Sequence, residues 1–349
     1  MLRRIRSRRT FTQRLRAIAA GAIPRSLNQG LALRMPGEPH RGPLPPFTPG
    51  ELALAAELRR DVEELAGRIG ERNVYNPAKL RQAEAYLENE LTRAGLQPRR
   101  QTYRVLGVDC TNFDAEVRGT EKPDEIVVLG AHYDALHGTT AANDNASGVA
   151  AVLALARRCA TGGLSGAAAP AGATAPKRTL RFALFMNEEP PFFWTDQMGS
   201  LVYARACKAR GENIVAMLTP ETIGYYSDEP RSQHYPIPVP GYPTQGNFIL
   251  FAGMYEARAL VRRCVGTFRR ECPFPCYGAA ATIMVPWIGA SDHWSFWKQD
   301  YPALMITDTA PLRYPHYHTP QDTPDKIDDE RTARVVTGIG RVLDDLLNR

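Results

Sequence analysis

Apolar residues recur at helical spacing in two segments near the start of the chain. The pattern covers residues 51–69, and residues 76–94 repeat it after an Asn-Pro start. In the first segment the apolar positions are Leu52, Ala55, Leu58, Val62, Leu65 and Ile69. Side chains three or four positions apart share one face of a helix, so the pattern predicts two amphipathic helices ahead of the first strand.

Short apolar runs of strand length follow, and they alternate with further helical patterns. We expect strands at 114–118, 125–131, 180–186, 214–218, 248–251 and 303–307. We expect helices at 146–159, 199–209, 254–270 and 328–347. Apolar strands that alternate with helices are typical of a sheet covered on both faces. The chain is therefore predicted to adopt a three-layer α/β/α fold in a single domain, with a central, twisted, mostly parallel (mixed) sheet.

The first 49 residues differ in composition from the rest. Seven arginines and no acidic residue occur in the first sixteen positions, and residues 36–49 carry six prolines. Residues 1–49 are therefore predicted to be a basic leader and a proline-rich linker, and residues 50–349 the folded domain. Residues 7–11 resemble a twin-arginine export signal, but no clean cleavage site follows, so a cytoplasmic and an exported protein both stay open.

Two internal segments read as long loops. Residues 161–176 are low in complexity and uncharged, which predicts a flexible insertion. Residues 225–247 are rich in proline and tyrosine. A long loop in a compact domain is often functional, so we expect this one to form a wall of a substrate pocket.

Charge and hydropathy exclude two classes of partner. The net charge is +6, but without the seven leader arginines 36 basic residues face 37 acidic ones. Nucleic-acid binding therefore has no electrostatic support outside the leader. No run of about 18 apolar residues occurs, so we expect no integral membrane span.

The six cysteines lack the Cys-x-x-Cys spacing of a metal site. Cys272 and Cys276 are close enough for a local disulfide, and two free thiols are the alternative.

Histidine and acidic residues stand at or just beyond the ends of the predicted strands. His132 follows the apolar run 127–131, and Asp134 could accept the second ring N–H of that histidine. Asp144 lies in Asn-Asp-Asn directly before a predicted helix, where a carboxylate could bridge two cations. Ligand sites in open α/β sheets lie beyond the carboxyl ends of strands, which makes these residues candidate ligands.

Three later strand ends carry further acids and a histidine. Glu188 and Glu189 follow the run 180–186, where adjacent carboxylates would repel each other without a cation or a proton. Glu221 ends a later strand, and His318 follows the strand 303–307. Together these positions supply the nitrogen and oxygen ligands that suit zinc.

The motifs occur in a characteristic order along the chain. They are His-x-Asp, Asn-Asp-Asn-x-Ser-Gly, Asn-Glu-Glu, an acid before x-Ile-Gly-Tyr, Ser-Asp-His-x-x-Phe, and Tyr-His-Thr-x-x-Asp-Thr. From residue 114 to residue 349 this order resembles the co-catalytic zinc exopeptidase family, which includes the bacterial leucyl aminopeptidases and is related to glutaminyl cyclase and glutamate carboxypeptidase. Residues 50–349 would accordingly be a zinc peptidase domain.

The resemblance implies two Zn²⁺ ions with a shared ligand. His132, Asp144 and Glu221 would hold one ion. Asp144, Glu189 and His318 would hold the other, so that Asp144 bridges the two. The family usually has aspartate where Glu221 stands, and the longer side chain still offers a carboxylate.

The resemblance also implies an aminopeptidase acting on peptides with a free amino terminus. Glu188 would be the general base, and Tyr317 would stabilise the oxyanion. Asp134 and Asp292 would support the ligands or line the pocket. We expect a side-chain pocket lined by aromatic residues such as Phe192, Phe193, Trp194, Tyr225 and Trp287.

Two other functions remain as alternatives. The first is a glutaminyl-cyclase-like acyltransferase with one zinc ion. A stoichiometry near one metal ion per chain would favour it, and a stoichiometry near two would favour hydrolysis. The second is a catalytically inactive binding module of the same fold. Such proteins normally lack some of the metal ligands, and all of the expected ones are present in this sequence.

Overall fold

A computed structural model describes residues 34–160, 163–164, 175–235, 239 and 241–349. Within these ranges the strands are β1 (Arg99–Val105), β2 (Val108–Val117), β3 (Lys122–His132), β4 (Arg178–Phe185), β5 (Asn213–Glu221), β6 (Ile249–Met254), β7 (Cys276–Ala281) and β8 (Ala303–Thr307). The α-helices are α3 (Pro49–Val62), α4 (Pro77–Arg93), α5 (Ser147–Ala160), α6 (Gly199–Ala209), α7 (Arg258–Glu271), α8 (His293–Trp297), α9 (Ala310–Arg313) and α10 (Asp329–Asn348). Short helices of other types are η1 (Glu63–Ile69), η2 (Ala142–Ala146), η3 (Tyr255–Ala257) and η4 (Pro324–Lys326).

All of these strands join one sheet in the order β1-β2-β4-β3-β5-β8-β6-β7. The central strands β4, β3, β5 and β8 are parallel, and so is the pair of β6 and β7. The strands β1 and β2 pair antiparallel, as do β2 with β4 and β6 with β8. The carboxyl ends of β3, β4, β5 and β8 therefore lie at the same edge of the sheet.

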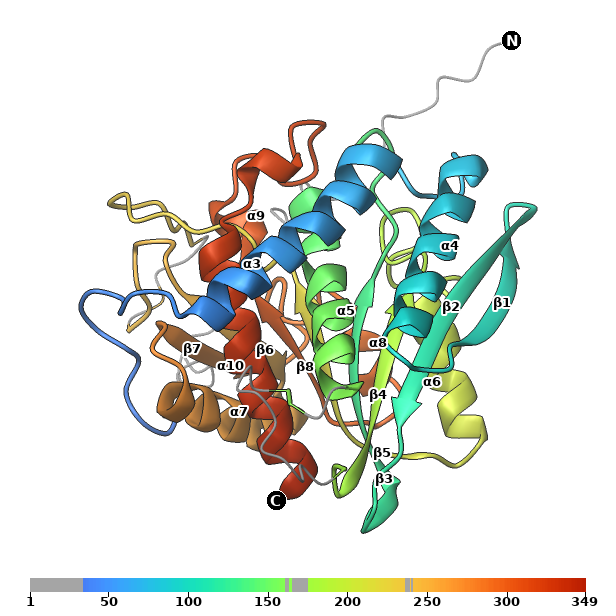
Figure 1. The fold of residues 1–349 in the computed structure, drawn as a ribbon. Coiled ribbons are helices and arrows are strands. Elements are labelled where there is room, and N and C mark those ends of the chain that lie inside the picture. The colour runs from blue at the N-terminus through green and yellow to red at the C-terminus, as the bar shows by residue number, and fades with distance from the viewer. Residues whose placement is uncertain (1–33, 161–162, 165–174, 236–238, 240) are drawn as a thin grey trace.

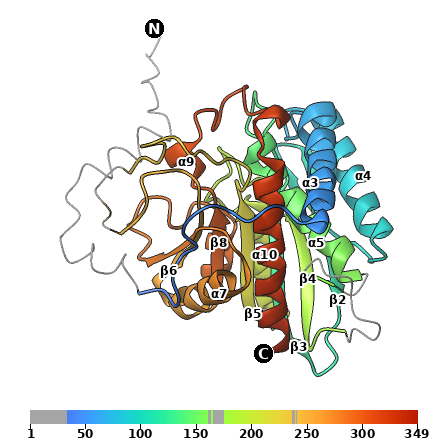
Figure 2. The same ribbon diagram turned by 60° about the vertical axis from the view of Figure 1, so that its left-hand side comes forward.

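Helices cover both faces of the sheet (Figures 1 and 2). On one face α5 contacts β3, β4 and β5, α10 contacts β3 and β4, and α7 contacts β6, β7 and β8. The helix α3 packs on α5 and α10 as an outer layer. On the other face α8 contacts β5, β6 and β8, and α6 contacts β2 and α8. The predicted three-layer α/β/α fold with a mixed sheet is confirmed.

Alternate residues of β3 enter two different cores. Val127 and Leu129 belong to the large core beneath α5, α7 and α10, whereas Ile126 and Val128 belong to a smaller core beneath α6 and α8. A strand that is buried on both faces reads as a continuous apolar run. This explains why the sequence 126–129 shows no polar alternation.

The start of α3 is set by local chemistry. Thr48 Oγ1 accepts a hydrogen bond from the Glu51 amide at 3.2 Å, and a Glu51 carboxylate oxygen accepts one from the Thr48 amide at 2.7 Å. This capping box satisfies two backbone N–H donors that the helix leaves free. Pro49, at the first helical position, has no amide hydrogen and therefore needs no acceptor.

All of the predicted helices and strands are found within four residues of the expected bounds, except that β2 begins six residues before the expected position 114. The sequence prediction missed β1 and β7, which are the two edges of the sheet. The strand β1 has the polar sequence RRQTYRV, and β7 has the small-residue sequence CYGAAA. Neither sequence carries the run of large apolar residues that marks a strand buried on both faces.

Several predictions concern segments outside the described residues. The leader 1–33 and most of the predicted insertion, 161–162 and 165–174, belong to this group.

Two further predictions concern described residues. Cys272 and Cys276 are free, buried thiols, so the structure has two free thiols and no disulfide between them. None of the described helices combines the length and the hydropathy needed to cross a bilayer.

Candidate active site

Three neighbouring parallel strands bring acids and a histidine to one place. His132 is the last residue of β3, Glu221 is the last residue of β5, and Glu189 follows β4, the neighbour of β3 on its other side. Asp144 lies in η2, directly before α5. His318 comes from the loop that follows α9. These are the five residues predicted to be ligands, and the structure brings all of them together.

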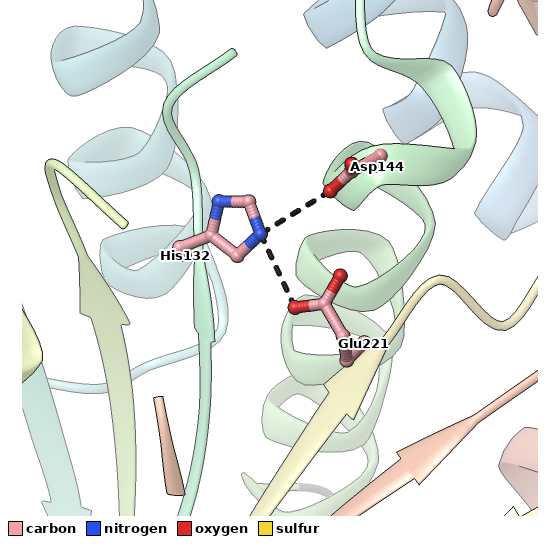
Figure 3. Close-up of side chains that lie close together, drawn as sticks. All are labelled: His132, Asp144 and Glu221. Carbon is pink, nitrogen blue, oxygen red and sulfur yellow. Dashed lines mark ion pairs between the residues drawn. The ribbon is translucent and has the colours of Figure 1, made fainter. Parts of the chain in front are cut away.

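The five side chains form two groups that could each hold a metal ion. His132, Asp144 and Glu221 offer ligand atoms that all lie within 4.8 Å of one another, and so do Asp144, Glu189 and His318. His132 Nε2 lies 3.2 Å from Glu221 Oε2 and 3.5 Å from Asp144 Oδ1 (Figure 3). The other Asp144 oxygen, Oδ2, lies 3.0 Å from His318 Nε2. Asp144 thus presents one oxygen to each histidine.

Several buried atoms of these groups have no hydrogen-bond partner. They are both ring nitrogens of His132, Asp144 Oδ2 and Glu189 Oε1. Buried polar atoms nearly always have a partner, so atoms left without one call for an ion or a water. Imidazole nitrogen and carboxylate oxygen are a donor set that suits zinc. The residues present therefore fit a pair of divalent cations.

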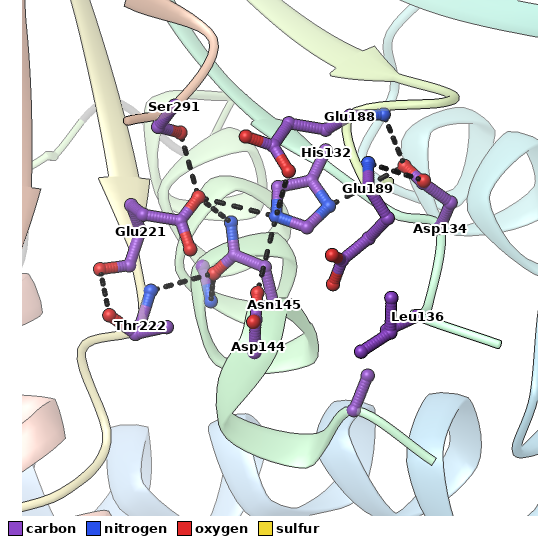
Figure 4. A network of polar contacts seen from close by, with 12 residues as sticks. His132, Asp134, Leu136, Asp144, Asn145, Glu188, Glu189, Glu221, Thr222 and Ser291 are labelled. Atoms are coloured by element: carbon purple, nitrogen blue, oxygen red, sulfur yellow. Dashed lines mark hydrogen bonds and ion pairs between the residues drawn. The ribbon is translucent and has the colours of Figure 1, made fainter. Parts of the chain in front are cut away.

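Glu188 lies beside the two groups without belonging to either. Its Oε2 is 3.8 Å from His132 Nε2 (Figure 4). Burial raises the pKa of Glu188 well above its usual range; His132 opposes this shift, whereas Glu221 and Glu189 add to it. A carboxyl group with a raised pKa beside a group of candidate metal ligands is a candidate for proton transfer.

Asp134 holds both glutamates and lies beside His132. Its two oxygens accept hydrogen bonds from the backbone amides of Glu188 and Glu189, each at 3.1 Å (Figure 4). Oδ1 also lies 3.4 Å from His132 Nδ1, although the two atoms are not aligned as a hydrogen bond. The predicted contact to His132 is therefore present as a close approach, and the bonds to the glutamate amides are additional to the prediction.

Burial and neighbouring charges shift the pKa values of three candidate ligands, Glu189, His318 and Asp144, and the shifts differ in direction. Burial and the nearby Asp144 raise the pKa of Glu189 to about 7. Burial opposes the charged form of His318, but Glu189 and Asp144 outweigh it and raise its pKa to about 10. Asp144 is also buried, yet His132 and His318 lower its pKa. Positive charge therefore stabilises this cluster, and metal ions would supply it.

Four of the described non-glycine residues with a positive φ angle lie around the site. The φ angle is +56° at Ala141, +63° at Asn187, +48° at Thr222 and +58° at His318. Each of these residues is a candidate ligand or lies close before or after one in the chain. Such conformations cost about 1–3 kcal/mol for residues other than glycine and persist only where the surroundings enforce them.

The entrance to α5 needs a glycine for close contact with β5. A Cβ atom at Gly148 would lie 2.4 Å from the Pro220 carbonyl oxygen and 2.3 Å from Asn145 Oδ1. Without that atom, Asn145 Nδ2 reaches the Pro220 carbonyl at 2.9 Å. The loop that carries Asp144 is thereby held close to the end of the strand that carries Glu221.

Three supporting residues were missed by the sequence analysis. Asp322 accepts hydrogen bonds from the amides of Asn143 at 2.8 Å and Asp144 at 3.1 Å. Ser291 Oγ donates to Glu221 Oε2 at 2.7 Å, and Asp308 Oδ2 accepts from Asn143 Nδ2 at 2.9 Å. Their positions in the sequence could have indicated a role at the site. Asp308 directly follows the end of β8, and Ser291 and Asp322 lie within the motifs named above.

Asp292, His293 and His137 stay outside the ligand groups. Asp292 is fully buried, and neither of its carboxylate oxygens has a hydrogen-bond partner. Burial raises its pKa to about 7, against the effect of His132. His293 contacts the Ile288 carbonyl at 2.7 Å, and the exposed His137 pairs with Glu71.

An apolar cavity of about 150 Å³ opens beside the candidate metal groups. Glu221 and Tyr317 are among the residues that line it. Most of its wall is apolar and includes Tyr235, Tyr242, Phe248, Leu250, Ala252, Val285, Trp287, Ile288, Ala290, Met305 and Leu312. The loop 225–247 contributes Tyr235, Val239 and Tyr242, so the prediction that this loop forms a pocket wall is confirmed.

Only one of the five aromatic residues expected in the pocket lines this cavity. That residue is Trp287. Phe192 is buried, Phe193 stacks on Trp194, and the ring of Tyr225 lies against that of Tyr314. The other four expected residues are absent from the lining of this cavity.

Tyr317 joins the cavity to the metal groups. Its ring stacks on His318 with the centroids 3.8 Å apart. Burial and the nearby Asp144 and Glu189 raise its pKa well above the usual value, so the phenol keeps its proton and remains a donor.

Comparisons with known proteins bear on the family and the fold of this chain. The sequence model of peptidase family M28 matches residues 112–342. The chain is 32% identical over 304 residues to uncharacterized protein YfbL of Escherichia coli strain K12, a match that covers 84% of this chain and 88% of that protein. Among solved structures it resembles BSAP, a zinc aminopeptidase from Bacillus subtilis (TM-score 0.65, 13% identity, 87% of this chain and 96% of that one).

A second solved structure of the same fold has another activity. Bacteroides thetaiotaomicron glutaminyl cyclase superposes with a TM-score of 0.62 at 17% identity, over 87% of this chain and 99% of that one. Likeness at this level of identity shows the shared fold alone. The family model matches most of the chain, and a match of this extent establishes the family. This protein belongs to peptidase family M28.

Proposed function

We propose that the protein is a metallo-aminopeptidase that hydrolyses the first peptide bond of substrates with a free amino terminus, using two Zn²⁺ ions. The observation that carries the proposal is the position of Asp144, whose two oxygens face different histidines. A carboxylate shared by two groups of ligands can hold two cations close together, as in two-metal sites.

His132, Asp144 and Glu221 would hold one ion, and Asp144, Glu189 and His318 the other. When bound, the ions supply Lewis acidity, which lowers the pKa of water and polarises the carbonyl group of the scissile bond.

Glu188 moves the proton in this proposal. It lies close to both groups and is not needed as a ligand, so its carboxylate is free to accept a proton from the attacking water. It then donates that proton to the leaving amine. The Tyr317 hydroxyl, which keeps its own proton, donates a hydrogen bond to the oxygen that gains negative charge.

The cavity supports a preference for one large apolar side chain at the amino end. Its wall is almost entirely apolar, and it adjoins Glu221 and Tyr317, where the scissile carbonyl and the amino group would lie. The surrounding carboxylates favour a positively charged α-amino group over an acylated one. Leucine and phenylalanine are therefore the side chains that we expect to be accepted best.

Glutaminyl cyclase activity is the alternative, because that activity occurs on the same fold. Fold likeness does not separate the two functions. Two complete groups of ligands favour hydrolysis with two metals over chemistry with a single zinc ion.

The test uses leucine p-nitroanilide, its N-acetylated form and a glutaminyl peptide, with protein stripped of metal and then reconstituted with zinc. We expect release of nitroaniline from the free amine alone, recovery of activity at two equivalents of zinc, and no cyclised product. Cyclisation of the glutaminyl peptide with maximal activity at one equivalent would contradict the proposal.

A further inference from the structure

A buried arginine from outside the family-matched region reaches the candidate metal centre. Arg72 lies between η1 and α4, forty residues before the match begins. Its side chain is fully buried, although an isolated buried charge is costly. The contacts that retain it are therefore informative.

The guanidinium group binds the loop that leads into Asp144. Nη1 donates to the Thr140 carbonyl at 2.7 Å, and Nη2 donates to the Ala141 carbonyl at 2.9 Å. Weaker bonds from Nη1 reach the carbonyls of Leu65 at 3.3 Å and Gly70 at 3.2 Å. One planar group thus fixes two successive peptide units of the loop and ties them to the end of η1.

The loop needs such support because it contains a strained residue. Ala141 has a φ angle of +56°, and Asp144 follows three residues later. On the far side Asp322 accepts the amides of Asn143 and Asp144. The backbone that presents Asp144 is therefore held by hydrogen bonds from Arg72 and to Asp322.

The same turn also holds the segment after His132. The Arg72 carbonyl accepts a hydrogen bond from the Ala135 amide at 3.1 Å, and Asn73 Nδ2 donates to the Ala135 carbonyl at 3.0 Å. Ala135 directly follows Asp134, the residue that binds the amides of Glu188 and Glu189. Residues 72 and 73 therefore contact the loops on both sides of the site.

The charge of Arg72 does not by itself favour metal binding. Burial lowers its pKa to about 10, while Asp134, Asp322, Asp144 and Glu189 act in the opposite direction, so the group is protonated at neutral pH. A positive charge close to a cation site repels cations. A purely electrostatic role would therefore weaken zinc binding, and the geometric role must outweigh this effect.

We propose that Arg72 is a positioning residue of the metal centre: it fixes residues 140–141 so that Asp144 presents one oxygen to each ion. This inference rests on the proposed two-metal function. It extends the active site to the N-terminal helical region, which lies outside the part of the chain that defines the family. A lysine could not replace the arginine, because an ammonium group lacks the planar fork that bonds two adjacent carbonyls.

The experiment compares R72M and R72K with a matched control, R334M. Arg334 is also buried and donates to Glu51 and to the carbonyls of Pro45 and Pro46, which are remote from the ligand groups in the chain. Zinc affinity is measured on metal-free protein by competition with a chelating dye. Amide hydrogen exchange of residues 139–146 is measured on the same metal-free samples.

We expect both Arg72 variants to bind zinc roughly 10- to 100-fold more weakly than wild type, the usual effect of losing a residue that orients a ligand. Exchange at 139–146 should rise in both, and R334M should leave both readouts unchanged. R72K keeps the charge and most of the volume, so it decides the question if R72M does not fold. Zinc binding at wild-type strength or tighter, with unchanged exchange, would overturn the inference.

The exchange measurement needs no metal, so it tests the positioning role even if wild type fails to bind two zinc ions. Failure of wild type to bind two ions would instead refute the proposed function.

Discussion

The candidate metal centre and the apolar cavity beside it share Glu221 and Tyr317, yet they are built in different ways. The metal centre is formed at the ends of the central strands β3, β4 and β5, and hydrogen bonds of 2.7–3.1 Å hold its glutamates. Much of the cavity wall comes from the loops 225–247 and 282–290. In the proposed function, the chemistry would depend on the ends of the central strands, and substrate choice would depend in part on these loops.

The polar contacts of the cavity wall illustrate this difference. Tyr242 OH donates to the Gly278 carbonyl at 2.6 Å, and Tyr235 OH donates to the Pro243 carbonyl at 3.0 Å. Both bonds hold a wall in place, and neither involves a candidate ligand. Substitutions in the centre should therefore affect all substrates, and substitutions in the wall should affect them selectively.

The largest effect is expected from E188A. Loss of a general acid–base group should lower kcat by roughly 10²- to 10⁴-fold, while both zinc ions remain, since Glu188 belongs to neither ligand group. Steady-state kinetics and metal analysis of the same samples check this. Activity within tenfold of wild type, or loss of zinc, would contradict the role given to Glu188.

The next effect is expected from H318A. Because His318 belongs to one ligand group only, the variant should lose about one of two zinc equivalents and lose activity towards every substrate. The matched control is H316A, which removes a histidine two positions earlier that packs on Tyr314. Equal zinc content in the two variants would show that His318 is not a ligand.

A cavity substitution should separate substrates instead. Ala290 is half-buried and lines the cavity, so A290F should shorten the space for the substrate side chain. We expect kcat/KM to fall by roughly 10- to 200-fold for leucine and phenylalanine p-nitroanilides and far less for the alanine compound. A uniform decrease for all three would indicate damage to the metal centre.

The smallest effect concerns pH. Without metal, the neighbouring acids raise the pKa of His318 to about 10, so a bound ion must displace its proton at neutral pH. Apparent zinc affinity should therefore rise roughly tenfold per pH unit for each displaced proton between pH 6 and pH 8. Dye competition at fixed ionic strength measures the slope, and a flat profile would contradict it.

The stability of the metal-free protein should decrease as pH rises, whereas zinc affinity increases. A histidine whose folded pKa is raised stabilises the fold fully below its unfolded pKa of about 6.5 and loses this contribution as pH rises towards about 10. Thermal unfolding of metal-free protein across this interval, compared with H318A, isolates the contribution.

The sheet and the five candidate ligands could be predicted from sequence for a common reason. Strands buried on both faces are long apolar runs, and their carboxyl ends meet at one edge, so acids and histidines that follow such runs converge. His132, Glu189 and Glu221 follow this rule directly. The edge strands β1 and β7 could not be found in this way, because their side chains are polar or small.

The cavity and Arg72 show what sequence patterns do not contain. Trp287, Tyr235 and Phe248 line the cavity from segments far apart in the chain, and of the five aromatics expected in the pocket Trp287 alone is among its lining residues. Arg72 lies in a short connection between two helices and has no periodic or motif signal. Its role depends on a contact 68 positions away along the chain.

The position of Arg72 has a practical consequence for recombinant fragments. A fragment trimmed to the boundaries of the family match, residues 112–342, would begin after β1, α3 and α4. It would lose the guanidinium that braces the Asp144 loop and would expose the apolar face of α5 that these helices cover. Such a fragment should aggregate and bind zinc poorly, although every residue of both ligand groups would still be present.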